Sequence, residues 1–147
     1  FTLFGARRFK KRSAEERCRL RVSYGGKSIE LEGLFDSGNL LREPISARPC
    51  IVVSTSTLGE LLPKTLLRAI AEKRTEELSR EEASRIRVVF MKTASGEKMS
   101  YAFRMDKIEL DVGRGMSEVD AFLAFSEVAI RAHGASALVP TELAIMR

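Results

Sequence analysis

One short stretch constrains this chain more than any other, the run Leu-Phe-Asp-Ser-Gly-Asn at residues 34–39. Upstream of it, residues 27–34 alternate polar and apolar side chains, which is the period of a half-buried strand. The next residues favour a tight turn, because Gly38 accepts backbone angles that other residues avoid and Asp, Ser and Asn side chains bond to nearby backbone. The sequence therefore predicts a carboxylate, that of Asp36, on a turn at the end of a strand.

A strand-end carboxylate followed by a small hydroxyl and a glycine is typical of aspartic proteases. Asp36 would project into a cleft, Ser37 would lock the turn, Gly38 would let a second copy of the loop pass close by, and Asn39 would complete the loop. Two such carboxylates, about 3 Å apart, share one proton, so one deprotonates water while the other protonates the scissile carbonyl. The triplet Asp-Ser-Gly also occurs in ordinary turns. Whether Asp36 is catalytic or only a turn residue therefore depends on the pattern of the rest of the chain.

The basic charge of the chain is concentrated at its start. The 147 residues carry a net charge of +5, and residues 1–12 contain 5 of the 25 basic residues and no acidic one. The remaining 135 residues hold 20 basic and 20 acidic side chains. A basic run is most often a solvated tail. The second interpretation is a segment that binds an anionic membrane surface, and the third is a nucleic-acid contact. The neutral body argues against a nucleic-acid-binding domain, and we expect no nucleic-acid partner.

The start of the chain also suggests a membrane nearby. Residues 1–6 are mostly apolar, they do not begin with Met, and Arg and Lys follow them. This is the pattern of a cytoplasmic juxtamembrane segment, so we expect a piece of a longer protein at the cell membrane. No apolar run approaches the roughly 18 residues of a spanning helix. We expect a basic juxtamembrane tail at residues 1–15 and one aspartic protease domain at residues 16–147.

The sequence predicts neither a metal site nor a bound cofactor. Cys18 and Cys50 are far apart, with no second pair to complete a metal site, and we interpret them as free thiols in a reducing compartment. The single histidine, His133, has no ligand partners at motif spacing and no serine in a nucleophile-elbow context. We expect it at the surface or in a turn.

The body of the chain predicts a mainly β fold with one helical insertion. Alternation at residues 16–24 and 27–34, around Gly25 and Gly26, predicts a hairpin. Residues 54–85 have leucines at helical spacing and capping residues, so we expect a helical insertion between strands.

The β pattern then returns and ends the domain. Residues 87–104 predict a long hairpin with its tip at Ala94, Ser95 and Gly96, and in an aspartic protease such a hairpin is the flap that covers the substrate. Strands are expected at residues 107–112 and about 119–125, and a buried strand enters a helix near Pro140. This order is that of a retropepsin-like acid protease half-barrel, which works as a two-fold dimer.

With these motifs in place, the chain resembles the sporulation sigma-E factor-processing peptidases, a family of membrane-associated aspartic proteases. The resemblance is to the C-terminal protease domain and covers nearly all of residues 16–144. Four stretches carry it, at residues 33–49, 61–63, 86–108 and 137–140. The family often has Thr where this chain has Ser37, and both residues supply the hydroxyl.

The resemblance implies properties that composition and spacing do not. It implies an enzyme of endospore-forming bacteria, held in the cell membrane by helices outside this chain, with the protease domain on the cytoplasmic side. The implied substrate is the inactive sigma-E precursor, which cleavage of its pro-sequence activates. The implied activator is a signalling protein from the forespore.

The number of aspartates sets the expected assembly. The dyad needs two carboxylates, yet only Asp36 is followed by Ser-Gly or Thr-Gly, and Asp106, Asp111 and Asp120 are expected at the surface. We therefore expect a homodimer in which Asp36 of each copy meets the other and Ser37 bonds across the two-fold axis. The alternative is a non-catalytic interaction module of the same fold, in which Asp36 is only a turn residue.

Overall fold

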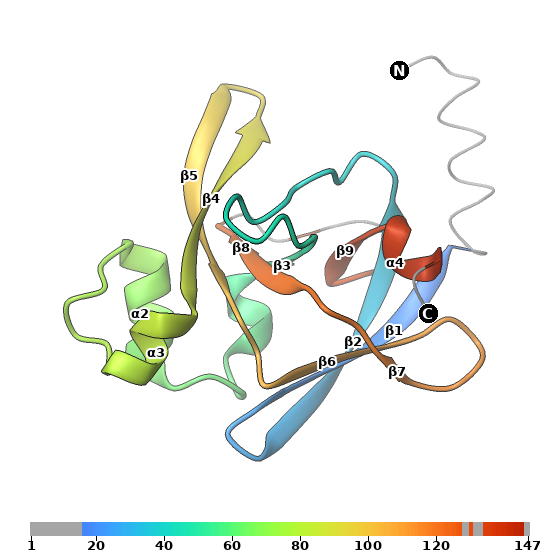
Figure 1. Ribbon diagram of the computed structural model, residues 1–147, viewed down its shortest axis with the longest axis horizontal. Helices are drawn as coiled ribbons and strands as arrows, with labels where there is room; N and C mark the ends of the chain where they lie inside the picture. Colours follow the sequence, from blue (N-terminus) through green and yellow to red (C-terminus); the bar gives the residue numbers. More distant parts are fainter. Residues whose placement is uncertain (1–15, 128–129, 131–133, 146–147) are drawn as a thin grey trace.

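The computed structural model describes residues 16–127, 130 and 134–145. Within these residues, nine strands form one open sheet in the order β4-β5-β8-β3-β9-β2-β1-β6-β7 (Figure 1). The strands are β1 Arg17–Tyr24, β2 Lys27–Asp36, β3 Cys50–Ser54, β4 Ile86–Thr93, β5 Gly96–Phe103, β6 Lys107–Asp111, β7 Ser117–Glu118, β8 Phe122–Ser126 and β9 Ala137–Pro140. The helices are η1 Thr55–Leu58, α2 Lys64–Glu72, α3 Arg80–Arg85 and α4 Glu142–Ile145. The prediction of a mainly β fold with a helical insertion is confirmed.

The N-terminal hairpin forms as its alternation predicts. β1 and β2 pair antiparallel along their whole length, and the turn between them places Gly25 and Gly26 in left-handed backbone, at φ 62° and 83°. β2 runs two residues further than predicted, because β9 pairs with its end in parallel, from Gly33 to Asp36. The predicted final strand and short helix correspond to β9 and α4.

The centre of the sheet is buried on both faces. β3 and β8 run parallel to each other, and their residues contribute alternately to a main core and to a small cluster on the opposite face. Strands buried on both faces have continuous apolar sequences. The apolar run at residues 119–130 therefore did not distinguish strand from helix by its pattern. The strand expected at about 119–125 is confirmed as β8, with a later start at Phe122.

The helical insertion covers the main core at one end of the sheet. α2 contributes Leu66 and Ile70 to that core, and Pro63 directly precedes the helix. α3 is a short, exposed helix that begins with a capping box between Ser79 and Glu82. After it, the β4–β5 hairpin extends beyond the rest of the sheet, and β4 is an edge strand (Figure 1).

No helix among the described residues is long and apolar enough to cross a membrane. The predicted juxtamembrane tail at residues 1–15 and His133 lie outside the described residues.

Candidate functional site

Asp36 is the last residue of β2 and lies half-buried opposite Pro140, the last residue of β9. Paired residues share a face of a sheet, and faces alternate along a strand. Following the register from β2 through β9, β3 and β8 to β5 therefore places Asp36 on the same face as Val52, Ala124 and Ala102. This face, opposite the main core, is called the Asp36 face below.

The turn after β2 is bonded to the carboxylate itself. Oδ1 of Asp36 accepts the Gly38 backbone N–H at 2.9 Å, and the Asp36 carbonyl accepts the Asn39 N–H at 3.0 Å. Gly38 is not in left-handed backbone, contrary to the reason that the sequence suggested for a glycine here. A glycine is favoured here because there is little room for a side chain: a Cβ at this position would lie 3.3 Å from Asp36 Oδ1. The glycine lets the backbone approach the carboxylate.

Asn39 fixes the turn to the sheet. Its side-chain amide donates to the carbonyls of Cys50 at 3.0 Å and Leu138 at 3.1 Å, which belong to β3 and β9. Its side-chain oxygen accepts the Leu41 N–H at 3.1 Å. One side chain thus satisfies backbone groups on three segments and holds the Asp36 turn at the ends of two strands. The sequence predicted Asn39 in the active-site loop but not this clamping role.

Glu43 organises the rest of the loop, a role that the sequence analysis did not predict. It is 1% exposed, and its carboxylate accepts the backbone N–H groups of Ile45 at 3.1 Å and Ser46 at 2.8 Å. Burial alone raises the pKa of Glu43, but the hydrogen bonds from Ser46 and Ile45, with the charge of Arg87, outweigh it and lower the pKa. An acidic residue just before a Pro and a Ser, in a loop between strands, was the available signal for this carboxylate-bound turn.

We expect Glu43→Gln to destabilise the protein by about 1–3 kcal/mol at pH 7, because it removes a buried carboxylate that accepts two backbone N–H groups. The pKa of Glu43 is lower in the folded protein than in the unfolded chain. The ionised carboxylate therefore stabilises the folded state at pH values above the ordinary glutamate pKa, and this stabilisation is lost as the pH falls through the folded pKa. Urea unfolding from pH 7 to 3 should show the two proteins converging. Glu60→Gln, at an exposed position, is the matched control. A difference that grows as the pH falls would contradict this account.

The outer surface of the loop is apolar. Leu40, next to the turn, is 82% exposed, and Ile45 is 87% exposed. Ser37 is exposed at the turn itself. The loop that follows Asp36 therefore presents two large apolar side chains and a hydroxyl to its surroundings.

The β4–β5 hairpin packs on the Asp36 face through side chains along β4. Val89 and Met91 belong to the small cluster that also includes Cys50 and receives Leu41 from the Asp36 loop. At the tip, Ala94 and Ser95 form the turn and Gly96, at φ 117°, begins β5. The predicted hairpin is confirmed, and it shares this cluster with the loop that carries the candidate catalytic residue.

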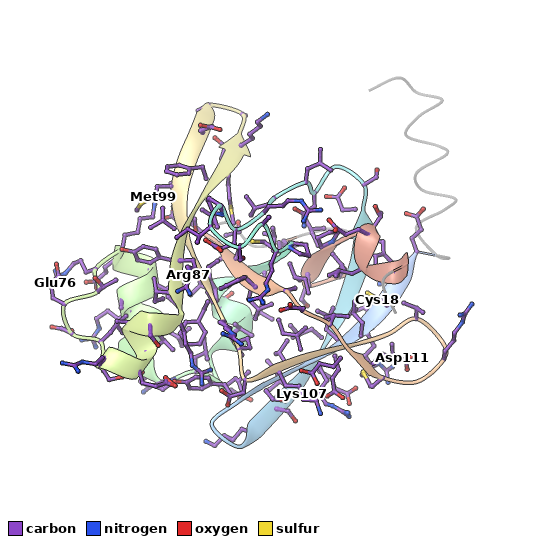
Figure 2. All side chains as sticks on the ribbon, viewed as in Figure 1. Cys18, Glu76, Arg87, Met99, Lys107 and Asp111 are labelled. Atoms are coloured by element: carbon purple, nitrogen blue, oxygen red, sulfur yellow. The ribbon has the colours of Figure 1, made fainter. Side chains whose placement is uncertain are left out.

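The other three aspartates of the chain are bound elsewhere. Asp106 accepts the Gly25 N–H at 2.8 Å and an Arg85 hydrogen bond at 2.6 Å, at the turn where β2 begins. The ten residues of β2 separate that turn from Asp36, a span of roughly 30 Å. Figure 2 shows Asp111 beside β6 and β7, where its Oδ1 accepts three backbone N–H groups at 2.7 to 3.1 Å.

Asp120 forms an ion pair with Arg48 at 2.9 Å, and its side chain is 66% exposed. Its carboxylate, like those of the other two, is therefore committed to a structural contact. Asp106 and Asp120 are exposed, as expected, and Asp111 is half-buried.

The two cysteines are buried, free thiols. Burial, with a smaller contribution from the charge of Glu43, raises the pKa of Cys50 to about 12, and burial with the charge of Glu32 does the same for Cys18. Thiolates are the reactive form of cysteine. Neither residue is therefore suited to act as a nucleophile at neutral pH.

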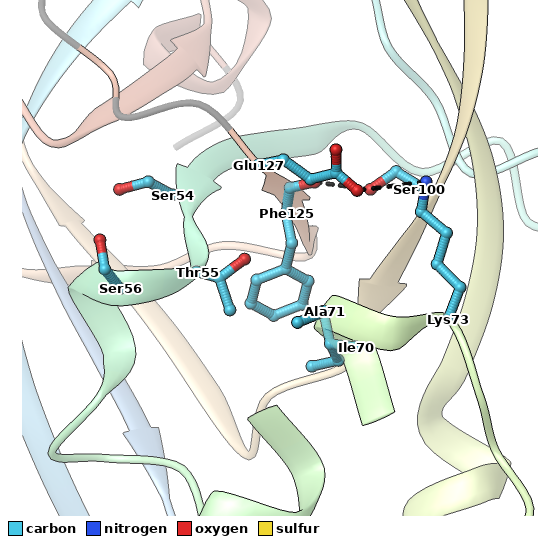
Figure 3. Close-up of a pocket in the computed structure, with 9 residues that line it drawn as sticks. All are labelled: Ser54, Thr55, Ser56, Ile70, Ala71, Lys73, Ser100, Phe125 and Glu127. Carbon is cyan, nitrogen blue, oxygen red and sulfur yellow. Dashed lines mark hydrogen bonds and ion pairs between the residues drawn. The ribbon is translucent and has the colours of Figure 1, made fainter. Parts of the chain in front are cut away.

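Two adjoining cavities lie between the β4–β5 hairpin, the end of β8 and the end of α2, with volumes of about 340 and 250 Å³. Both are lined by Lys73, Ser100, Phe125 and Glu127, and Figure 3 shows the larger one. Asp36 lines neither cavity. In a single chain, the carboxylate and these cavities are separate features.

Comparison with known proteins places the chain in a family. Residues 2–143 match the model of a peptidase family described as sporulation factor SpoIIGA. The chain is 26% identical over 88 residues to the sporulation sigma-E factor-processing peptidase of Priestia megaterium, covering 56% of this chain and 29% of that protein. It is 26% identical over 98 residues to a candidate sporulation sigma factor-processing peptidase of Bacillus thuringiensis subsp. kurstaki, covering 63% of this chain and 61% of that protein.

No solved structure matches the chain. The chain spans less than two thirds of either curated relative. The family match, in contrast, extends over almost the whole chain, and the chain therefore belongs to the sporulation factor SpoIIGA family of peptidases.

Proposed function

We propose that this chain is the protease domain of an aspartic endopeptidase whose catalytic dyad consists of Asp36 from two copies of the chain. The observation that carries the proposal is the setting of Asp36. It ends a buried strand, its turn is bonded to its own carboxylate, and the other aspartates are engaged by other groups. A second carboxylate for the dyad then comes from a second copy of the same turn.

In such a dimer the two carboxylates share one proton, which belongs to the pair rather than to either residue. Oδ1 of Asp36 is held by the Gly38 N–H, so the dyad is oriented before substrate arrives. The ionised carboxylate takes a proton from water, which attacks the scissile carbonyl, while the protonated one donates to the carbonyl oxygen. Collapse of the tetrahedral intermediate returns a proton to the leaving nitrogen and restores the shared proton.

Features of the loop surface support the dimer. Large apolar side chains are enriched in homodimer interfaces, and Leu40 and Ile45 project from the loop beside the turn. We assign the exposed Ser37 hydroxyl to a bond across the two-fold axis, as a dimer lock with Gly38 and Asn39. The retropepsin-like half-barrel is part of the same proposal.

We assign the β4–β5 hairpin to the flap, with Ala94, Ser95 and Gly96 over the substrate. In support, the hairpin packs on the Asp36 face through Val89 and Met91 of β4. An extended peptide on this face would pair its backbone with protein strands while the flap excludes water.

The name of the Priestia relative supports the sigma-E precursor as the substrate. From the family resemblance, we place the domain on the cytoplasmic side of the cell membrane, held there by helices outside this chain. A signalling protein from the forespore would activate it. The mechanism uses neither a metal nor a cofactor.

Mixing experiments test the shared site. We expect Asp36→Asn chains added to a fixed amount of wild-type protein to lower cleavage of the sigma-E precursor, because mixed dimers lack one carboxylate. With random pairing, an equal amount leaves about half the rate and a threefold excess about a quarter. Asp120→Asn chains should not lower it. An unchanged rate in the presence of Asp36→Asn would contradict a dyad built from two copies.

A further inference from the structure

A charged cluster on β5, β8 and α2 has no part in the catalytic proposal. The Glu127 carboxylate, directly after β8, pairs with Lys73 at 3.3 Å and with Lys98 of β5. Lys73 is the C-cap of α2 and adopts left-handed backbone at φ 56°. Two ammonium groups and one carboxylate leave this cluster with a net positive charge. Glu127 is thus already neutralised, so the cluster favours an anion over a cation.

The cluster lines a cavity of about 250 Å³, which suits one side chain rather than a whole ligand. Hydroxyls and apolar groups complete the lining, contributed by Thr93, Ser95, Ser100, Ser126, Met91, Met99 and Phe125. Figure 3 shows the adjoining cavity, where Lys73, Glu127 and Ser100 meet on one side and Ser54 and Ser56 lie on the other. Two of the hydroxyls already donate within the protein, Ser100 Oγ to the Phe125 carbonyl and Thr93 Oγ1 to the Gly96 carbonyl. The ammonium groups are therefore the groups that can pair with a carboxylate.

The lining of the cavity comes from both faces of the sheet. Lys98, Ser100 and Ala102 occupy every second position of β5 and therefore lie on the Asp36 face, as do Ala124 and Ser126 of β8, whereas Met99 and Phe125 lie on the opposite face. The register through β9 and β3 brings Asp36 level with Phe122 of β8. From there, Ser126 lies four residues further along β8, and β8 is three strands across from β2. These steps correspond to roughly 20 Å from Asp36, or about six residues of an extended peptide.

We propose that this cavity is a specificity subsite that binds an acidic side chain of the peptide cleaved at Asp36. The substrate carboxylate pairs with Lys98, while Glu127 keeps its contact with Lys73. The acidic residue lies about four to six positions from the scissile bond. This inference rests on the proposed function and adds the chemical class that the site selects.

Peptide binding tests the subsite separately from catalysis. Labelled peptides from the sigma-E precursor, spanning the bond mapped by mass spectrometry, are titrated into full-length Asp36→Asn protein, with each acidic residue replaced in turn by its amide. We expect one replacement to weaken binding by about tenfold or more, the effect of a charge-assisted hydrogen bond. Lys98→Met should weaken binding of the acidic peptide by the same factor and should not weaken binding of the amide peptide further. Lys98→Arg should restore binding.

Lys92→Met is the matched control, because Lys92 lies on the same hairpin but on its opposite face. Equal weakening of acidic and amide peptides by Lys98→Met, or no weakening, would overturn the subsite. In cleavage assays of otherwise wild-type protein, Lys98→Met should raise KM and leave kcat unchanged. Normal cleavage by Asp36→Asn would instead overturn the catalytic proposal, and charge-dependent peptide binding would still reveal the subsite.

Discussion

Replacing Asp36 by asparagine should abolish cleavage of the sigma-E precursor while leaving the fold intact. Asn keeps an oxygen that can accept the Gly38 N–H now bonded at 2.9 Å, so the turn should keep its geometry. Two amides, however, can neither share a proton nor take one from water. We expect the rate to fall by at least about a thousandfold, the scale of losing general acid–base chemistry. Cleavage is measured by gel or mass spectrometry, and the fold by the thermal unfolding midpoint.

Asp120→Asn provides the matched control for this prediction. It makes the same chemical change at an exposed aspartate whose ion pair with Arg48 is 2.9 Å long, and exposed pairs contribute little to stability. Its cleavage rate should equal that of the wild type. If Asp36→Asn also cleaved normally, Asp36 would be a turn residue only and the proposed catalytic dyad would be wrong.

Local patterns in the sequence predicted most of the strands and the candidate catalytic turn. Alternation predicts the β1–β2 and β4–β5 hairpins, because each buries one face and its turn residues are adjacent in sequence. Asp36, Ser37, Gly38 and Asn39 do form the turn after β2. These features depend on neighbours within a few residues, which a single sequence displays.

Long-range pairings were outside what the pattern could predict. The parallel pairing of β2 with β9 joins segments about a hundred residues apart, and no local spacing encodes such a register. The roles of Asn39 and Glu43 depend on the same pairings, because their partners are backbone groups brought together by folding. The backbone angles expected of Gly38 were wrong, and its contact with the Asp36 carboxylate depends on coordinates that the sequence does not display.

Gly33→Ala should be the most destabilising conservative change near the site. Gly33 lies in β2 between β1 and β9, and a Cβ there would come within 2.5 Å of Leu20 Cδ1, 2.9 Å of Cys18 Sγ and 3.1 Å of Val139 Cγ2. All three neighbours are buried in the main core, so they have little room to move. Overpacking of this kind costs about 1–3 kcal/mol, which urea unfolding would measure.

The same substitution at Gly59 separates this steric effect from the general effect of replacing glycine. Gly59 has helical backbone at φ −58°, and its added Cβ would lie 3.4 Å from Ser56 O, an ordinary contact. Gly59→Ala should therefore be neutral or stabilise by up to about 1 kcal/mol. Leu20→Val removes the closest δ-carbon, so the double variant with Gly33→Ala should be more stable than the two single effects add up to. Strict additivity would mean that the added Cβ does not collide with the Leu20 side chain.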